Sequence, residues 1–138
     1  MLKFLSWTWL GLILGVSFLA TPAKFQAETL TLPVALEVGR VTFRLLDRLE
    51  WLLLVAVLVA AWRHRPSLGQ DRGALAAAAV LAAVTAVQSL YFLPALDARV
   101  ALVMAGEPLP ESSLHAVSGG LEVVQALTLL ILGIRARP

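Results

Sequence analysis

Two stretches of this sequence carry ionisable side chains at helical spacing within apolar surroundings. Between Glu37 and Trp51, charged residues fall within about a third of the circumference of a helix drawn at about 100° per residue. Near the C-terminus, four polar residues recur at intervals of three, four and three, which also places them on one helix face. The first stripe holds Glu37, Arg40, Arg44, Asp47 and Arg48, and Glu50 follows it along the chain. The second stripe holds His115, Ser118, Glu122 and Gln125.

Three kinds of chemistry fit such stripes. The charges can pair and hold helices together, with Arg40 and Asp47 among the structural ion pairs. They can form a site for a proton, a cation or a small ligand, because ionisable groups inside a membrane are usually functional. They can also serve an enzyme, although no catalytic residue is assigned. His115 and Glu122 lie about 10 Å apart along a helix axis, too far to share a metal, so neither a metal nor a cofactor is expected.

Composition identifies the solvent in which these stripes fold. Of the 138 residues, 59% are apolar and 14% are charged, against about 25% charged in soluble domains. The net charge of +2 is small and the basic residues are scattered, so no nucleic-acid partner is implied. The absence of cysteine excludes a disulfide framework and a cysteine nucleophile. We therefore expect a lipid bilayer as the partner of most of the surface.

Four segments are apolar and long enough to be membrane helices in a single domain spanning residues 1–138. Crossing a bilayer core takes about 20 residues of helix. The apolar part of the second segment is shorter than this, so the span must also include the charged residues that precede it. Its helix is expected to extend outward to about Pro33, with Thr31 as the cap. A short amphipathic helix is expected at the outer surface near Ala95 to Ala105. The predicted spans are residues 4–21, 43–62, 73–93 and 113–134. The first of them can alternatively be a cleaved signal peptide.

The distribution of Lys and Arg predicts the orientation. Both ends of the chain and the loop between the second and third segments are basic, whereas the two remaining loops carry more acids than bases. Because cytoplasmic loops are enriched in Lys and Arg, both termini are predicted to be cytoplasmic. The fold class is thus an all-α, integral membrane four-helix bundle, with a multi-pass arrangement in a bacterial inner membrane.

Depth counting brings the two stripes together. Glu50 and Glu122 each lie 12 residues from the inner boundary of their segment, and Gln88 lies near the same level on the third segment. Arg48 and Arg44 occupy the next turns outward. An unpaired charge at the bilayer centre costs about 2.5 to 3.5 kcal/mol. We therefore predict an ion pair of Arg44 or Arg48 with Glu122 or Glu50.

Several stretches resemble known membrane proteins. "WLGLILGVSFLATPAKF", "LPVALEVGRVTF", and "LPALDARV" followed by "LHAVSGGLEVVQALTLLILG" are similar to small four-helix bacterial membrane proteins of unknown function. A more distant similarity is to the transmembrane-protein-205-like family, whose last helix carries a His, then a Ser and a further polar residue, as at His115, Ser118 and Glu122. That family usually has Asn at the last position, so Glu122 departs from the pattern. The resemblance implies a four-helix fold rather than an activity.

Together these observations predict a small membrane protein with an intramembrane polar cluster that handles a proton, a cation or a small ligand. An accessory or scaffold subunit of a larger membrane complex is the alternative, and a membrane enzyme is a second one. A membrane protein partner or a homo-oligomer is expected in the scaffold case. The candidate ligand or ion site comprises His115, Ser118, Glu122, Gln125, Gln88, Glu50, Arg48 and Arg44.

Overall fold

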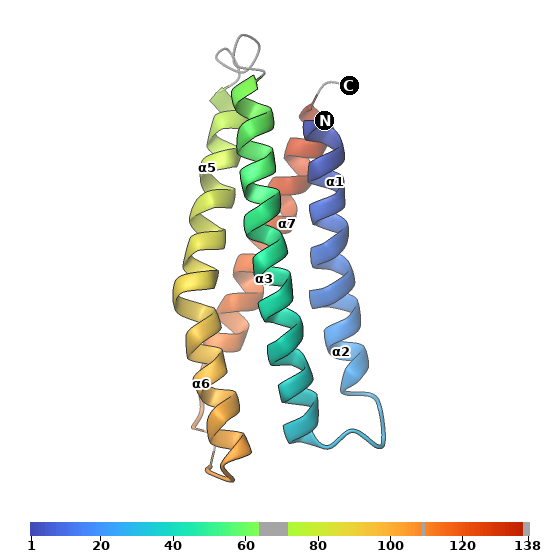
Figure 1. Cartoon of the computed structure of the whole chain (residues 1–138), viewed down its shortest axis with the longest axis vertical. Helices are drawn as coiled ribbons and strands as arrows, with labels where there is room; N and C mark the ends of the chain where they lie inside the picture. The colour runs from blue at the N-terminus through green and yellow to red at the C-terminus, as the bar shows by residue number, and fades with distance from the viewer. Residues whose placement is uncertain (64–71, 109, 137–138) are drawn as a thin grey trace.

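The computed structural model describes residues 1–63, 72–108 and 110–136, and every regular element in them is helical. Arg65 and Arg137, which contribute to the predicted basic surface, lie outside the described residues. The elements form four rods that surround a common axis (Figure 1). Both termini lie at the same end of the bundle, which is called the terminal end below, and the opposite end is called the distal end.

Two of the four rods change helix type along their length. The first consists of α1 (Leu2–Ile13), the π-helical η1 (Leu14–Ala20) and α2 (Thr21–Lys24). The third consists of α5 (Arg72–Val87), the π-helical η2 (Gln88–Phe92) and α6 (Leu93–Met104). The second rod is α3 (Leu32–Arg63) and the fourth is α7 (Leu114–Arg135).

Within the described residues, three of these rods are long and apolar enough to cross a membrane: Leu2–Lys24, Gly73–Met104 and Leu114–Arg135. The second rod, α3, is also long, but it carries Asp47, Arg48 and Glu50 in the middle of its length. Many large apolar side chains on the outside of the bundle remain exposed, as expected where lipid replaces water. The chain is therefore a multi-pass helical protein suited to a bilayer.

Two prolines explain the π-helical turns. Pro22 and Pro94 stand within the first two positions of α2 and α6. A proline ring clashes with the carbonyl four residues earlier, and the wider π turn before it relieves that clash. The hydroxyl of Thr21 donates to the carbonyl of Val16 at 2.9 Å, which satisfies one of the freed acceptors.

The predicted separate helix near the outer surface differs from the structure. We expected the third span to end at Leu93 and a short helix to follow, because proline usually ends a helix. Instead α6 continues the direction of α5 through η2, so that Gly73–Met104 forms one rod. Membrane helices tolerate proline when local π turns satisfy the backbone again, and that is the arrangement here.

The terminal half of the bundle is well packed. Trp9 and Ile13 of α1 are fully buried against Val57 of α3, Leu81 of α5 and Leu129 of α7. Gly133 allows α7 to pack closely against α1, since a Cβ atom at this position would lie 3.2 Å from the indole of Trp7. A pocket beside Val57 and Leu132 in this half, among the described residues, measures only about 10 Å³.

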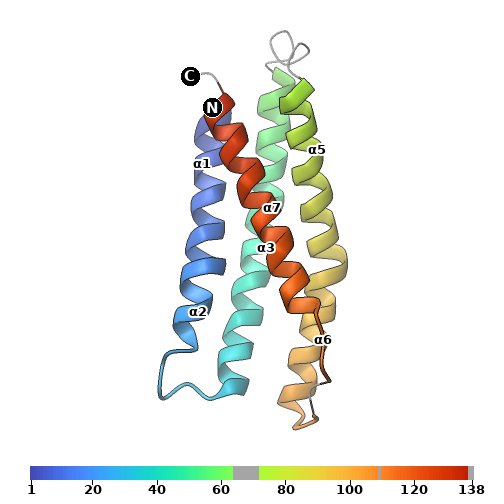
Figure 2. The same ribbon diagram turned by 180° about the vertical axis from the view of Figure 1, so that it is seen from behind.

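The distal half is more open because α7 is oblique. Figure 2 shows α7 close to α1 at the terminal end and close to α6 near its own N-terminus. As α7 leans toward α6, it leaves α2 behind. The space between these rods is the cavity described next.

Candidate ligand-binding site

A buried hydrogen-bond network joins all four rods at mid-height. Glu50 of α3 is 6% exposed, and its Oε1 accepts bonds from Nε1 of Trp9 at 3.0 Å and from Nε2 of Gln125 at 3.1 Å. The same Gln125 nitrogen lies 3.3 Å from Oγ1 of Thr85 on α5, to which it also donates. Because each rod supplies one side chain, the network fixes the relative depth of the helices.

Above this network, toward the distal end, lies a cavity of about 570 Å³. This volume is typical of sites for small organic ligands. Most of its wall is apolar and includes Phe18, Phe43 and Phe92. The two π turns lie at the level where the cavity begins and contribute Ser17, Phe18, Gln88 and Phe92 to its lining.

The inner end of the cavity is acidic. Glu50 forms part of the lining, and Asp47 and Glu122 lie near enough to interact electrostatically with it. Within the described residues, no ion pair joins any of these three carboxylates to a basic side chain. Ser17 lies beside Glu122, close enough for its hydroxyl to interact with that carboxylate. The inner end can therefore accept a positive charge.

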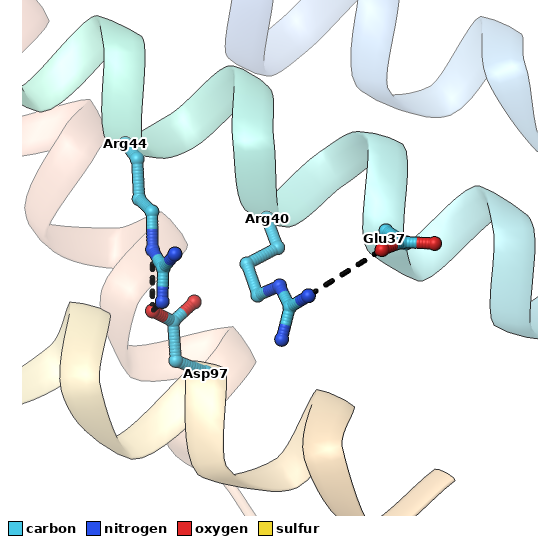
Figure 3. A network of polar contacts seen from close by, with 4 residues as sticks. All are labelled: Glu37, Arg40, Arg44 and Asp97. Atoms are coloured by element: carbon cyan, nitrogen blue, oxygen red, sulfur yellow. Dashed lines mark hydrogen bonds and ion pairs between the residues drawn. The ribbon is translucent and has the colours of Figure 1, made fainter. Parts of the chain in front are cut away.

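The outer part of the cavity is basic. Arg40 lines it and pairs at 3.5 Å with Glu37, as Figure 3 shows. Arg99 also lines it and donates to the backbone carbonyl of Pro110 at 2.6 Å. Lys24 reaches across from α2, so that its Nζ occupies the space that a Cβ atom on Gly39 would need. The positive charges thus lie away from Glu50 and Glu122, whereas Asp97, which also lines the cavity, is paired with Arg44.

A comparison with known families places this chain. A family described as a domain of unknown function (DUF4149) matches residues 4–102. The chain belongs to this family. The predicted membership of a small, uncharacterised family of membrane-like proteins is therefore confirmed, whereas the link to the transmembrane-protein-205-like family is not. No curated protein and no solved structure matches the chain.

The DUF4149 match covers only part of the site. Trp9, Glu50 and Thr85 of the network and Lys24, Arg40 and Arg99 of the mouth lie within residues 4–102. The residues that α7 contributes lie outside that range. The carboxylate of Glu50, with its Trp9 donor, is thus the part of the site that lies in the DUF4149 region, and α7 completes it in this chain.

The structure separates the predicted site residues into three groups. His115, Ser118, Glu122, Gln88 and Glu50 line the cavity, and the backbone carbonyl of Ser118 accepts a long bond of 3.5 Å from Nε2 of Gln88. Gln125 is fully buried in the network below. Arg44 and Arg48 do not line the cavity and are largely exposed.

The predicted ion pair of Arg44 or Arg48 with Glu122 or Glu50 is wrong. Arg44 instead binds Asp97 of α6, with its Nε 2.7 Å from Oδ2 (Figure 3). Arg48 forms no ion pair with any described residue. The reason is the continuation of α6 past Pro94, which brings Asp97 beside α3. Asp47, expected in a structural pair, has no ionic partner among the described residues and lines the cavity.

Several site residues were missed from the sequence. Trp9 is not among the predicted site residues, although an indole N–H within an apolar helix needs a partner. Lys24 and Arg99 are likewise absent from the predicted site. Arg99 could have been found from the sequence, because a helix that continues past Pro94 places Arg99 on the same rod as Gln88.

Proposed function

We propose that this chain is a non-enzymatic, multi-pass membrane protein that binds a small organic cation in the distal cavity. Support comes from the DUF4149 match, from the apolar rods and from the acidic inner end of the cavity. The cation site consists of Glu50, Glu122 and Asp47, and Ser17 and Gln88 add uncharged oxygen atoms beside them. The apolar wall would hold the body of the ligand.

The observation that carries this proposal is the position of Glu50. Glu50 is only 6% exposed at the inner end of a cavity, and its hydrogen-bond donors, Trp9 and Gln125, are both neutral. A buried carboxylate without a counter-charge is costly, and a bound cation removes that cost. Purely structural helix packing does not require such a group, because apolar and small residues suffice.

The geometry favours an organic cation over a metal ion. Within the described residues, no three His, Cys, Asp or Glu side chains converge as a metal site. The cavity is also far larger than a dehydrated ion, and aromatic rings such as Phe43 and Phe92 line it. An ammonium group with an apolar body would use both the carboxylates and the rings.

In this proposal the terminal end faces the cytoplasm of a bacterium and the cavity opens to the outside. The basic N- and C-terminal segments support this orientation. The packed core around Trp9, Val57 and Leu81 closes the cavity toward the cytoplasm. Ligand would enter and leave on the outer side, as in a binding protein or in the outward-facing state of a carrier.

The test is calorimetric titration of the purified full chain, in mild detergent, with benzyltrimethylammonium. We expect saturable binding that Glu122→Gln and Glu50→Gln each weaken by about tenfold. Glu107→Gln, at an exposed position outside the lining, is the matched control and should bind like the unaltered protein. Thermal unfolding of each variant establishes that it is folded.

Binding that is absent, or equal in all four proteins, would overturn the proposal. If the unaltered protein then co-purified with a stoichiometric membrane partner, the accessory-subunit alternative would stand in its place. Liposome flux of the same cation, measured with the unaltered protein and with Glu122→Gln, separates a carrier from a binding protein.

A further inference from the structure

The cavity has two charged ends of opposite sign. Asp47, Glu50 and Glu122 stand at the inner end, and Lys24, Arg40 and Arg99 stand toward the mouth. These six side chains do not neutralise one another, because the only ion pairs within the described residues are those of Arg40 with Glu37 and Arg44 with Asp97. Such a separation suits a ligand that carries both charges.

An unsatisfied polar atom lies toward the mouth. Nε of Arg40 is buried there without a hydrogen-bond partner, and Arg40 lines the cavity. A buried donor without an acceptor is costly, so this atom indicates where an anionic group of a ligand would be bound.

The distance between the ends follows from α3. Arg40 and Glu50 are ten residues apart on this helix, which corresponds to about 15 Å along its axis. Phe43 and Leu46 of α3 and Leu96 of α6 line the stretch between them. The lining thus changes from acidic to apolar to basic over this length.

From this pattern we propose that the cavity binds an elongated zwitterion, with an ammonium group at Glu50 and Glu122 and an anionic group at Lys24, Arg40 and Arg99. Its charges lie about 15 Å apart and its middle is apolar. The proposal rests on the proposed function and adds the class of ligand. A short apolar peptide with free termini has this chemistry, since four extended residues span about 13 to 14 Å.

The lipid that surrounds the protein does not supply this ligand. In a zwitterionic phospholipid the ammonium and phosphate groups are neighbours, and the acyl chains carry no charge. A lipid headgroup at Lys24 and Arg40 would place its tails against the acidic inner end. The separated charges of the cavity therefore favour a soluble zwitterion over a lipid.

The experiment titrates the full chain in detergent with the tetrapeptide Ala-Leu-Leu-Ala. The same peptide is also used with its N-terminus acetylated or with its C-terminus amidated, each of which removes one charge. We expect the free peptide to bind about tenfold more tightly than either capped form. Arg40→Gln should weaken binding of the free and acetylated peptides and leave the amidated peptide unaffected. Glu122→Gln should weaken binding of the free and amidated peptides and leave the acetylated one unaffected.

The length of the peptide provides the second control. The dipeptide Ala-Leu is too short to reach both ends and should bind no better than a capped tetrapeptide. Arg48→Gln, which removes a cation outside the lining that has no ion pair among the described residues, should not change binding of any peptide.

The possible failures are distinguishable. If benzyltrimethylammonium binds but the free tetrapeptide gains nothing over the amidated form, the zwitterion proposal is overturned and the cation site remains. If vesicles or micelles of phosphatidylglycerol displace the peptide and bind in an Arg40-dependent manner, the mouth binds lipid and the zwitterion proposal is again overturned. If Glu122→Gln changes nothing for any probe, both proposals fail.

Discussion

The indole Nε1 of Trp9 donates a hydrogen bond of 3.0 Å to Oε1 of Glu50, across 41 positions of sequence. Trp9 is fully buried in the packed half of the bundle, and Glu50 reaches the cavity in the open half. The bond therefore lies at the boundary between the two halves. It holds the carboxylate at the inner end of the cavity instead of letting it turn toward lipid.

Removal of this bond should destabilise the protein. We expect Trp9→Phe to lower the free energy of unfolding by about 1 to 3 kcal/mol, because a buried carboxylate loses one of its two donors. Reversible unfolding in mixed detergent micelles, followed by tryptophan fluorescence, measures the change. Trp51→Phe is the matched control, since it removes a bond of equal length to the hydroxyl of Ser89 at an exposed site. An equal loss in both variants would contradict the special role of Trp9.

The network should be energetically coupled across the bundle. In a double-mutant cycle, Glu50→Ala and Gln125→Ala should show a coupling free energy of about 0.5 to 3 kcal/mol, because each variant deprives the other residue of its partner. The same unfolding measurement applies. A parallel cycle of Glu50→Ala with Thr128→Ala should be additive, since the Thr128 hydroxyl binds a carbonyl of its own helix. Additivity in both cycles would show that the bonds contribute no coupling.

The contact of α7 with α1 should not tolerate added volume. A Cβ atom at Gly133 would lie 3.2 Å from two atoms of the Trp7 indole. Gly133→Val should therefore cost about 1 to 3 kcal/mol of unfolding free energy through overpacking. At Gly120 a Cβ atom would meet nothing within 4 Å, and Gly120→Ala should be neutral or stabilising. A neutral Gly133→Val variant would show that α7 does not approach α1 this closely.

The ion pair of Arg44 with Asp97 should respond to charge exchange. Asp97→Arg alone should lower the unfolding free energy by less than about 1 kcal/mol, because half of the Arg44 side chain is exposed. Combining it with Arg44→Asp should recover most of the loss. Combining it with Arg48→Asp should recover nothing, since Arg48 has no ion pair within the described residues. Equal recovery in both combinations would place Asp97 nearer to Arg48 than the structure shows.

Orientation can be tested by reporter fusions. The excess of Lys and Arg at both chain ends predicts that a fusion at Pro138 reports the cytoplasm, and the basic loop predicts the same for Pro66. A fusion at Pro108 should report the outside. Alkaline phosphatase and green fluorescent protein provide opposite readouts. An external C-terminus would reverse the proposed orientation and place the mouth of the cavity in the cytoplasm.

The sequence alone determined the features that depend on composition and local spacing. Its apolar content and segment lengths predicted four membrane-type helices, because a bilayer requires long apolar stretches with internally satisfied backbones. Helical phase grouped His115, Ser118 and Glu122, since residues on one face of one helix keep that relationship in any fold. Depth counting placed Glu50, Glu122 and Gln88 at a similar level.

The tertiary structure decided which of these side chains meet and what surrounds them. Counting along helices gives depth but not the tilt of α7 or the continuation of α6 beyond Pro94, and these two features determine the cavity and the pairing of Arg44 with Asp97. The donor to Glu50 depends on how α1 is rotated against α3, which arises from packing around Trp9. Contacts between helices depend on side-chain fit over the whole bundle, whereas each helix on its own depends only on neighbouring residues.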